Sequence, residues 1–338
     1  MKYATFEITT PAGPLTKVGV AEDGCLVDVA AVYGAYLRDK KHVYAWKAVA
    51  EDLIPSDMLK LIERAPASTD AVAQAMEYYH ADGNPERGSD GVQFRYAEET
   101  VRLRAPLRPR SMRDSSCYIR HMEEACRLNN RPFNELTKVL PAHYRTSATN
   151  VAGPGDPILW PSHGTNELDY ECEFAFVIGR YGEDITEENA RDYIFGVTMY
   201  NDISIRDVQM RERGLGMGPV KGKNFLNSNI LGPYIVTLDE LDLHDIDIEV
   251  LLNGKSMGSD TTGDMFYTPE RLIEYVCQSD SLLPGEVIAS GTIGPGTCGQ
   301  NGFWLKEGDV VEFRSKALGA TLRNVVAKKP EQFKVSKF

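Results

Sequence analysis

The sequence predicts a β-rich α+β protein in which a small N-terminal unit at residues 1–108 precedes a larger unit at residues 109–338. Two observations support this. Beyond about residue 110, many short segments are candidate strands and few have helical spacing, which favours a β-roll or barrel over a doubly wound sheet. A stretch rich in proline and arginine near 105–112 has the composition of a linker.

Composition excludes several classes of protein. The 338 residues carry 37 Lys and Arg against 49 Asp and Glu, and this net charge of −12 argues against a nucleic-acid partner. No apolar run approaches the roughly 18–20 residues that span a bilayer, and the acidic N-terminal segment does not resemble a signal peptide. We therefore expect a cytoplasmic protein. Six scattered cysteines without a CxxC pair predict reduced thiols.

The N-terminal unit reads as a hairpin, a helical region and a strand. Leu15–Val29 alternates around the turn signal Asp23-Gly24, which predicts a β-hairpin. Helical spacing runs from Trp46 to Tyr79 and is interrupted near 66–68 by proline and serine. Val101–Leu107 alternates as a strand does.

The larger unit contains most of the predicted strands, at Leu168–Ile178, Tyr193–Tyr200, Ile230–Val236, Ile246–Leu252, Val287–Ile293 and Val310–Arg314. Asn253-Gly254 is a hairpin turn signal. Short helices are predicted at Glu187–Tyr193 and Pro269–Gln278. Thr268 can cap the second of these, with proline at its first position.

Acidic residues follow two of these strand patterns. Glu171 and Glu173 are two apart, so on a strand they share a face, and a bound Mg²⁺, Mn²⁺ or Ca²⁺ would balance their charge. A solvent-exposed strand end is the alternative. Asp202 follows an apolar strand and could be a third oxygen ligand, while Arg206 could bind a carboxylate. The alternative there is a polar loop with an Asx turn.

Three further motifs could carry chemistry. His121 and Glu124 have i, i+3 spacing, which suits a histidine base oriented by a carboxylate; an incidental pair on a surface helix is the alternative. Lys223 follows a glycine and could stabilise an oxyanion, or belong to a surface turn. The Gly-rich segment around Thr292 could bind a carboxylate or carbonyl oxygen, or be an ordinary tight turn.

Together and in this order, these motifs resemble the fumarylacetoacetate hydrolase superfamily over about residues 114–315. The resemblance rests on Y-x-x-H-x-x-E from Tyr118 to Glu124, the D-Y-E-x-E segment from Asp169, N-D-x-S-x-R-D-x-Q from Asn201, G-K at Lys223, and the Gly-rich turn at Thr292. It implies a mixed β-roll or β-sandwich catalytic domain behind a small N-terminal domain, and a homodimer.

The resemblance also implies roles for individual residues. Metal ligands would be Glu171, Glu173, Asp202 and Asp114; catalytic residues would be His121, Glu124 and Lys223; substrate-binding residues would be Tyr144, Arg206, Gln209 and Thr292. The sequence departs from the family after Lys223, where it reads Asn-Phe-Leu-Asn, and after Thr292, where it has Pro-Gly-Thr-Cys and lacks a glutamate. Both departures leave the substrate open.

The implied function is metal-dependent hydrolysis of a C–C bond in a β-diketo acid, such as an acylpyruvate or fumarylacetoacetate-like compound, through a metal-stabilised enolate. Mg²⁺ is the expected cation, with Mn²⁺ or Ca²⁺ as alternatives, and the partner is a small anionic keto acid. Such an enzyme would act in the breakdown of aromatic compounds. Decarboxylation, hydration or isomerisation of a 2-oxo acid could use the same metal site. A non-catalytic β-roll that binds a small acid is the alternative from another class.

Overall fold

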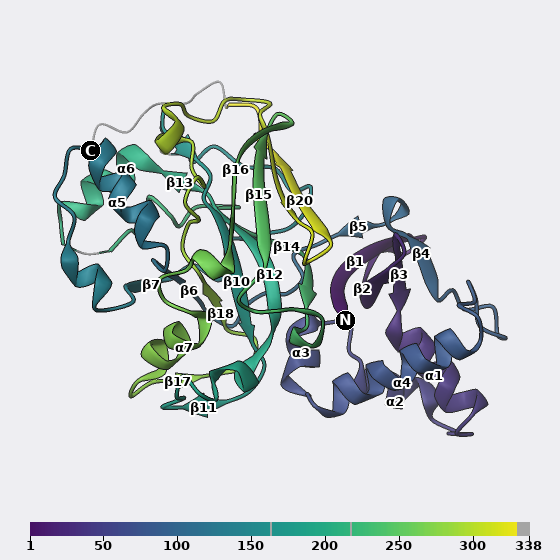
Figure 1. The fold of residues 1–338 in the computed structure, drawn as a ribbon. Coiled ribbons are helices and arrows are strands. Elements are labelled where there is room, and N and C mark those ends of the chain that lie inside the picture. Colours follow the sequence, from purple (N-terminus) through teal and green to yellow (C-terminus); the bar gives the residue numbers. More distant parts are fainter. Residues whose placement is uncertain (163, 217, 330–338) are drawn as a thin grey trace.

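The computed structural model describes residues 1–162, 164–216 and 218–329 and has a sheet-dominated α+β fold. Figure 1 shows a large unit built mainly of strands beside a smaller unit in which helices lie next to a curved hairpin. The predicted β-rich α+β class is therefore confirmed. Among the described residues, no helix is both long and apolar enough to cross a bilayer. All six cysteines are free, as expected.

The N-terminal unit contains β1 (Lys2–Thr10), β2 (Gly13–Glu22), β3 (Cys25–Asp28), α1 (Val29–Asp39), α2 (Trp46–Leu53), α3 (Met58–Glu63), α4 (Ala67–Ala81), β4 (Arg95–Ala97), η1 (Glu98–Thr100) and β5 (Arg102–Leu103). The β2–β3 hairpin turns at Asp23-Gly24, both with positive φ, as predicted. The helical region has two breaks. One follows α2, where Asp57 caps α3, and the other lies before α4, which already includes Ser68. The strand predicted at 101–107 is reduced to β5.

The strands of the large unit are β6 (Met112–Ser115), β7 (His143–Thr146), β8 (Val151–Ala152), β9 (Leu168–Asp169), β10 (Cys172–Ile178), β11 (Gly182–Glu183), β12 (Ile194–Asp202), β13 (Ser204–Ile205), β14 (Asn229–Val236), β15 (Asp247–Leu252), β16 (Lys255–Thr261), β17 (Ser281–Leu282), β18 (Val287–Ala289), β19 (Val310–Ser315) and β20 (Ala320–Val325). Its α-helices are α5 (Ile119–Leu128), α6 (Arg206–Arg213) and α7 (Pro269–Cys277). Short 3₁₀ helices are η2 (Glu135–Lys138), η3 (Ala190–Tyr193), η4 (Leu238–Glu240), η5 (Thr262–Asp264) and η6 (Gly299–Asn301).

Most predicted strands of this unit are present, with two instructive differences. The strand predicted at 168–178 is divided into β9 and β10, with Glu171 between them in an isolated bridge to Thr297. The strand predicted at 287–293 ends at Ala289, because Gly291 adopts a positive φ where a side chain would collide with the Ser115 carbonyl. The helix predicted at 187–193 is only η3, whereas Thr268 caps α7 as predicted.

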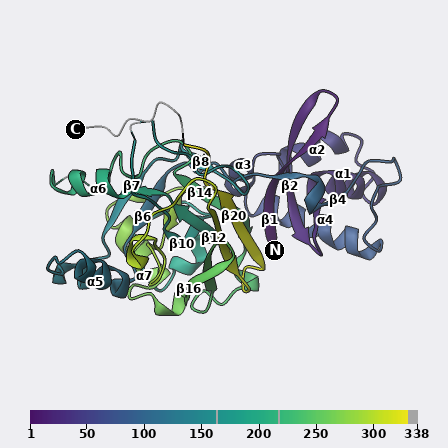
Figure 2. The same ribbon diagram turned by 90° about the horizontal axis from the view of Figure 1, so that it is seen from above.

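One long sheet joins the two units, in the order β4-β3-β2-β1-β14-β12-β10-β18-β6-β7. The junction is the antiparallel pair β1–β14, with Tyr3 opposite Ile235. Because the sheet is continuous, the division at 108/109 stays a prediction. A second sheet of the large unit, β16-β15-β19-β20, shares an apolar cluster with β10 of the long sheet (Figure 2).

The buried strand β10 carries a different core on each face. Phe174 and Phe176 belong to the cluster shared with the second sheet, while Ala175 and Val177 belong to a cluster shared with the N-terminal helices. This alternation confirms the period of two read from the sequence. It also fixes the side of the sheet from which Glu173, two positions before Ala175, can reach neighbouring strands.

Candidate metal centre

Four carboxylates from separate parts of the chain converge. Asp114 lies on β6, Glu171 just before β10, Glu173 on β10 and Asp202 at the end of β12. All four are buried, and one oxygen of each lies within 4.8 Å of one oxygen of every other. The exposed-strand-end interpretation of Glu171 and Glu173 is therefore wrong, because these side chains point into the protein and not to solvent.

Strand pairing explains this convergence. Antiparallel pairing places Glu173 of β10 opposite Tyr200 of β12, and the Asp202 amide donates a 3.1 Å hydrogen bond to the Glu171 carbonyl. On the other side of β10, β18 pairs with β10 and with β6, which carries Asp114. Acids that are far apart in sequence thus meet near the ends of neighbouring strands.

The Gly-rich turn after β18 holds one of these carboxylates. Glu173 accepts a 3.1 Å hydrogen bond from the Gly291 amide and a 3.2 Å hydrogen bond from the Thr292 hydroxyl. This segment is therefore more than a tight turn, because the Gly291 amide and the Thr292 hydroxyl hold the Glu173 carboxylate in place. Thr292 also lines the adjoining cavity, so its predicted contact with substrate stays a prediction.

Two cations neutralise part of the cluster. The buried Lys223 ammonium donates to both Glu171 and Asp202. The Arg206 guanidinium contacts Glu171 at 2.7 Å and Asp169 at 2.8 Å, and donates to Gln209 at 3.0 Å. Lys223 is thus not part of a surface turn, and Arg206 is engaged with protein acids. Gln209 is buried beside it.

The four acids titrate differently because their neighbours differ. Burial raises the pKa of Glu171, but Arg206 and Lys223 outweigh it and hold that pKa below its ordinary value. Burial, followed by repulsion from the neighbouring acids, raises the pKa of Glu173 well above its usual range. Burial likewise raises the pKa of Asp202 well above normal despite Lys223, and raises that of Asp114. Four ionised carboxylates would carry more negative charge than the two cations Lys223 and Arg206 balance.

These residues fit a divalent cation. Oδ1 of Asp114 and Oδ1 of Asp202 are buried without a hydrogen-bond partner, and unpaired buried acceptors are costly. Tyr144 donates to Oδ2 of Asp114 at 2.6 Å and to Oδ2 of Asp202 at 3.2 Å, which leaves both Oδ1 atoms available. An all-oxygen donor set suits Mg²⁺, Mn²⁺ or Ca²⁺. Tyr144 was predicted to contact substrate, and here it contacts two candidate ligands.

The structure does not pair His121 with Glu124. Both residues lie on α5, but Glu124 is bound to Arg127 at the surface, and Nδ1 of His121 is buried without a partner. Burial lowers the pKa of His121, although Glu171 partly offsets the effect, so the imidazole is neutral near pH 7. In this structure Glu124 forms an i, i+3 ion pair with Arg127 at the surface, and the predicted catalytic roles of His121 and Glu124 stay a prediction.

A cavity of about 250 Å³ opens onto the carboxylate cluster. Its lining includes the predicted residues Asp114, His121, Tyr144, Glu171, Glu173, Gln209, Lys223 and Thr292. It also includes two residues that sequence reasoning missed, Arg131 and Arg213. Asp169, buried and bound to Arg206, was missed as well, although it begins the D-Y-E-x-E segment.

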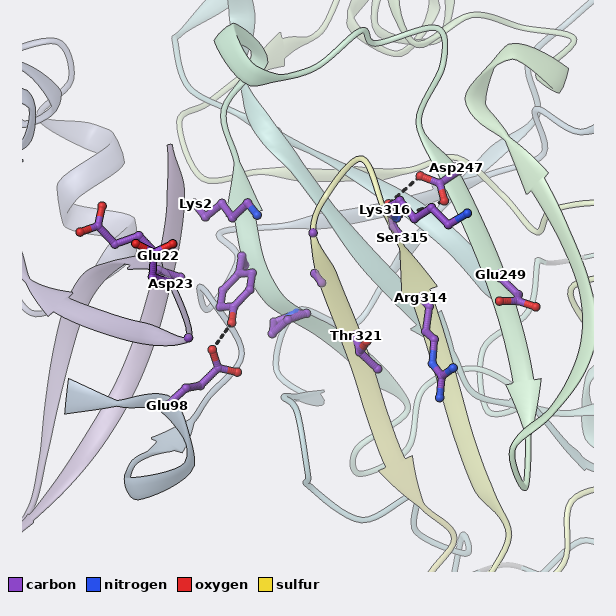
Figure 3. A pocket seen from close by; sticks show the side chains of 16 residues that line it. Lys2, Glu22, Asp23, Glu98, Asp247, Glu249, Arg314, Ser315, Lys316 and Thr321 are labelled. Atoms are coloured by element: carbon purple, nitrogen blue, oxygen red, sulfur yellow. Dashed lines mark hydrogen bonds between the residues drawn. The ribbon is translucent and has the colours of Figure 1, made fainter. Parts of the chain in front are cut away.

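A larger cavity of about 650 Å³ lies elsewhere, between the N-terminal unit and the second sheet. Figure 3 shows Lys2, Glu22, Asp23 and Glu98 on one side of it and Asp247, Arg314 and Lys316 on the other. Mixed charges line it, and no predicted site residue is among them. The cavity of about 250 Å³ beside the four carboxylates is therefore the candidate active site, and the larger cavity is not.

Comparison with known proteins agrees with this geometry. The model of the fumarylacetoacetate (FAA) hydrolase C-terminal domain matches residues 111–327. The chain belongs to the fumarylacetoacetate hydrolase family. Within that family, it is 31% identical over 278 residues to a mitochondrial oxaloacetate tautomerase of Bos taurus, covering 82% of each chain. It is 37% identical over 188 residues to a mitochondrial oxaloacetate tautomerase of Xenopus laevis, covering 55% of this chain and 58% of the frog protein.

Solved structures of the family share the fold. The fumarylacetoacetate hydrolase of Exiguobacterium antarcticum is 25% identical, with a TM-score of 0.68 over 97% of this chain and 100% of that one. The maleylpyruvate hydrolase of Sphingobium sp. SYK-6, solved with manganese(II) and pyruvate, is 20% identical, with a TM-score of 0.68 over 98% of this chain and all of that one. Family members thus include hydrolases and tautomerases, and the family resemblance read from the sequence is confirmed.

Proposed function

We propose that this chain is a divalent-metal-dependent enzyme that forms and reprotonates the enol of a small 2-oxo acid. The observation that carries the proposal is the meeting of four buried carboxylates and one buried ammonium at a cavity of about 250 Å³. Drug-sized sites are usually larger, on the order of 300–1,000 Å³, so this cavity suits a compact acid. Asp114, Glu171, Glu173 and Asp202 would hold the cation, which supplies a Lewis acid for the substrate oxygens.

Lys223 acts in this proposal as a fixed positive charge and not as a base. Burial lowers its pKa, but Asp202 and Glu171 outweigh that effect and hold the pKa above its ordinary value. The ammonium therefore keeps its proton near pH 7. It can stabilise negative charge that grows on a substrate oxygen, which is what enol formation requires.

His121 is the candidate proton carrier. Its neutral ring lines the cavity, and its Nδ1 is buried without a hydrogen-bond partner. In conversion of a keto acid to its enol, C3 loses a proton and the carbonyl oxygen gains one; the reverse reaction returns both. A neutral imidazole can accept the C3 proton and deliver a proton to the carbonyl oxygen; in the reverse reaction it moves a proton from that oxygen to C3, so no further reactant is needed.

Tautomerisation is favoured over hydrolysis by the position of Glu124. Hydrolysis needs an activated water, and the pair that would activate it is not assembled, because Glu124 is bound to Arg127. Tautomerisation needs only proton transfer within the cavity. The bovine relative, similar over 82% of both chains, is an oxaloacetate tautomerase, which supports the same reaction class here.

Hydrolysis of a C–C bond in a β-diketo acid is the second candidate. The neutral His121 favours it, because a base near neutral pH could also take a proton from water. It would require α5 to bring Glu124 away from Arg127 and toward His121.

The expected Mg²⁺, the homodimer and the cytoplasmic location also remain proposals.

The test measures proton exchange at C3. Metal-free protein, and protein with Mg²⁺ or Mn²⁺, is incubated in D₂O with a panel of 2-oxo acids, and deuterium at C3 is followed by NMR. We expect metal-dependent exchange above the rate of the metal alone. Loss of a β-diketone absorbance without exchange of simple 2-oxo acids would instead establish hydrolysis. The proposal would be overturned if the protein showed neither exchange nor hydrolysis under all three conditions: metal-free, with Mg²⁺ and with Mn²⁺.

A further inference from the structure

The His121 imidazole meets the Gly-rich turn that follows β18, while Glu124 is paired with Arg127. Burial lowers the pKa of the ring, and hydrogen bonding to the Gly294 backbone is among the effects that raise it. A hydrogen-bond acceptor favours the protonated ring, so the group that the ring meets is the Gly294 carbonyl. The orientation of His121 therefore depends on where this turn lies.

Asp260 holds the turn in place. This aspartate lies on β16 of the second sheet, and its side chain is buried. Its Oδ2 atom accepts a 2.9 Å hydrogen bond from the Gly294 amide and another of 2.9 Å from Arg120, the residue before His121 on α5. One oxygen of the second sheet thus fixes both the turn that the imidazole meets and the helix that carries the imidazole.

The packing around Gly294 leaves no space for a side chain. A Cβ atom added there would lie 2.9 Å from Oδ2 of Asp260 and 3.0 Å from a guanidinium nitrogen of Arg120. Both distances are shorter than an ordinary van der Waals contact, so one of the two partners would have to move. Glycine at this position lets the ion pair between Asp260 and Arg120 approach the backbone of the turn closely.

Two further hydrogen bonds attach the beginning of α5 to the same part of the large unit. The Tyr118 hydroxyl donates to the Thr261 carbonyl at 3.1 Å, and the Phe266 amide donates to the Cys117 carbonyl at 2.8 Å. Both bonds join the helix end to the segment at and just after β16, whereas Asp260 also binds the Gly-rich turn. Asp260 is therefore placed to control the relation between helix and turn.

We propose that Asp260 is a positioning residue of this active site, which acts through Arg120 and Gly294 to keep the His121 imidazole in one tautomer and one orientation. The inference rests on the proposed function only for the role of His121 as proton carrier. Catalytic bases are commonly oriented by a further hydrogen-bonding group. Here a buried carboxylate does so through a backbone carbonyl. A displacement of 1 Å can cost about 100-fold in rate, so loss of this contact should impair proton transfer.

The test uses the Mg²⁺-loaded full chain and three variants. Asp260→Asn keeps the shape of the buried side chain but removes its charge. Arg120→Gln removes the partner cation from a side chain that is 69% exposed, so it should fold even if Asp260→Asn does not. Gly294→Ala inserts a Cβ atom between the two. NMR of ¹⁵N-labelled histidine rings reports the tautomer, and the signal of His121 is the one that disappears in His121→Asn.

We expect one His121 tautomer in the unaltered protein, with its proton on the ring nitrogen nearer Gly294, and a mixture of tautomers in each variant. In the C3 exchange reaction, kcat should fall about 10-fold or more, as for other residues that orient a functional group. KM and Mg²⁺ affinity should change little, because the carboxylate cluster is untouched. Asp245→Asn is the matched control, since it removes the same charge from an exposed residue shortly before β15 of the same sheet.

Two results would overturn the inference. One is a tautomer and a kcat in Asp260→Asn and Arg120→Gln that equal those of Asp245→Asn. The other is an unchanged tautomer with kcat, Mg²⁺ affinity and thermal stability falling together, which would mean that Asp260 only supports the fold. The tautomer is read without substrate. A single tautomer that the variants disrupt, in a protein without C3 exchange, would therefore retain this inference and reject the proposed reaction.

Discussion

The Tyr144 hydroxyl donates a 2.6 Å hydrogen bond to Oδ2 of Asp114, thirty positions earlier in the chain. The hydroxyl is part of a buried cluster, and Oδ1 of the same aspartate has no partner. The tyrosine thus orients one oxygen of Asp114 and leaves the other free. This contact makes Asp114 a candidate ligand for geometric reasons that do not depend on family resemblance.

Removing that hydroxyl should weaken metal binding without abolishing it. In Tyr144→Phe, Asp114 loses its orienting donor, and we expect Mg²⁺ or Mn²⁺ affinity to fall roughly 10-fold, as for other residues that position a ligand. Titration calorimetry with each metal measures this change. An unchanged affinity in Tyr144→Phe, combined with an unchanged affinity in Asp114→Asn, would remove Asp114 from the ligand set.

Asp202→Asn should abolish metal binding and activity together. The substitution keeps the shape of a fully buried side chain but removes its charge and one strong ligand, so we expect affinity to fall by at least ~100-fold. Glu188→Gln removes one negative charge from an exposed residue and should leave metal affinity and activity unchanged. Metal-dependent turnover retained in a Glu171→Gln, Glu173→Gln double variant would contradict the assignment.

Lys223→Met should destabilise the metal-free protein strongly. It leaves Glu171 and Asp202 buried without their shared cation, and breaking a buried ion pair on one side costs about 3–5 kcal/mol. Saturating Mg²⁺ should recover part of the loss, since a ligand that binds only the native state stabilises it. Urea unfolding with and without metal measures both effects. Lys221→Met, at an exposed neighbour, is the control. A loss equal to that control would mean that the ammonium does not balance the cluster.

The metal should also weaken the pH dependence of stability. The native pKa values of Glu173 and Asp202 are raised above their unfolded values by burial. The native state thus binds more protons than the unfolded chain, and this contribution is complete below the ordinary carboxyl range. It is lost as the pH rises through the raised values. Glu171, whose pKa is lowered, acts in the opposite sense below the ordinary range.

We therefore expect the chelator-treated protein to lose stability as the pH rises above the ordinary carboxyl range, and the metal-loaded protein to lose much less. Metal binding should release protons and strengthen over the same interval. Thermal unfolding across pH and calorimetry in buffers of different ionisation enthalpy measure these changes. Metal affinity that is independent of pH would show that the cluster is already fully ionised.

His121 and Glu124 separate the two candidate reactions. His121→Asn should keep the metal but reduce either reaction by roughly 10²–10⁴-fold, the usual contribution of a general base. Glu124→Gln should leave tautomerisation nearly unchanged, because Glu124 is bound to Arg127 and not to His121. It should reduce hydrolysis if α5 rearranges. A large loss of C3 exchange in Glu124→Gln would show that the dyad forms during tautomerisation as well.

Local sequence determined the strands, their turns and the acids that matter. Alternation located β10, and apolar segments located β12 and β14, each to within a few residues. Strands that are buried on both faces, such as β14, have near-continuous apolar sequences. Spacing also identified Glu171, Glu173 and Asp202 as unusual acids near strand ends. The residue types of the cluster could thus be read from the chain, and family resemblance added Asp114.

Tertiary structure decided which side chains meet. That Glu124 binds Arg127, that Tyr144 reaches Asp114, and that Arg131 and Arg213 share one cavity depend on how α5, α6 and the strands pack. Helical spacing alone allows Glu124 to face either His121 or Arg127, since both are three positions away. Electrostatic balance in a buried site is a sum over neighbours from distant segments, and the order of residues along the chain does not contain that sum.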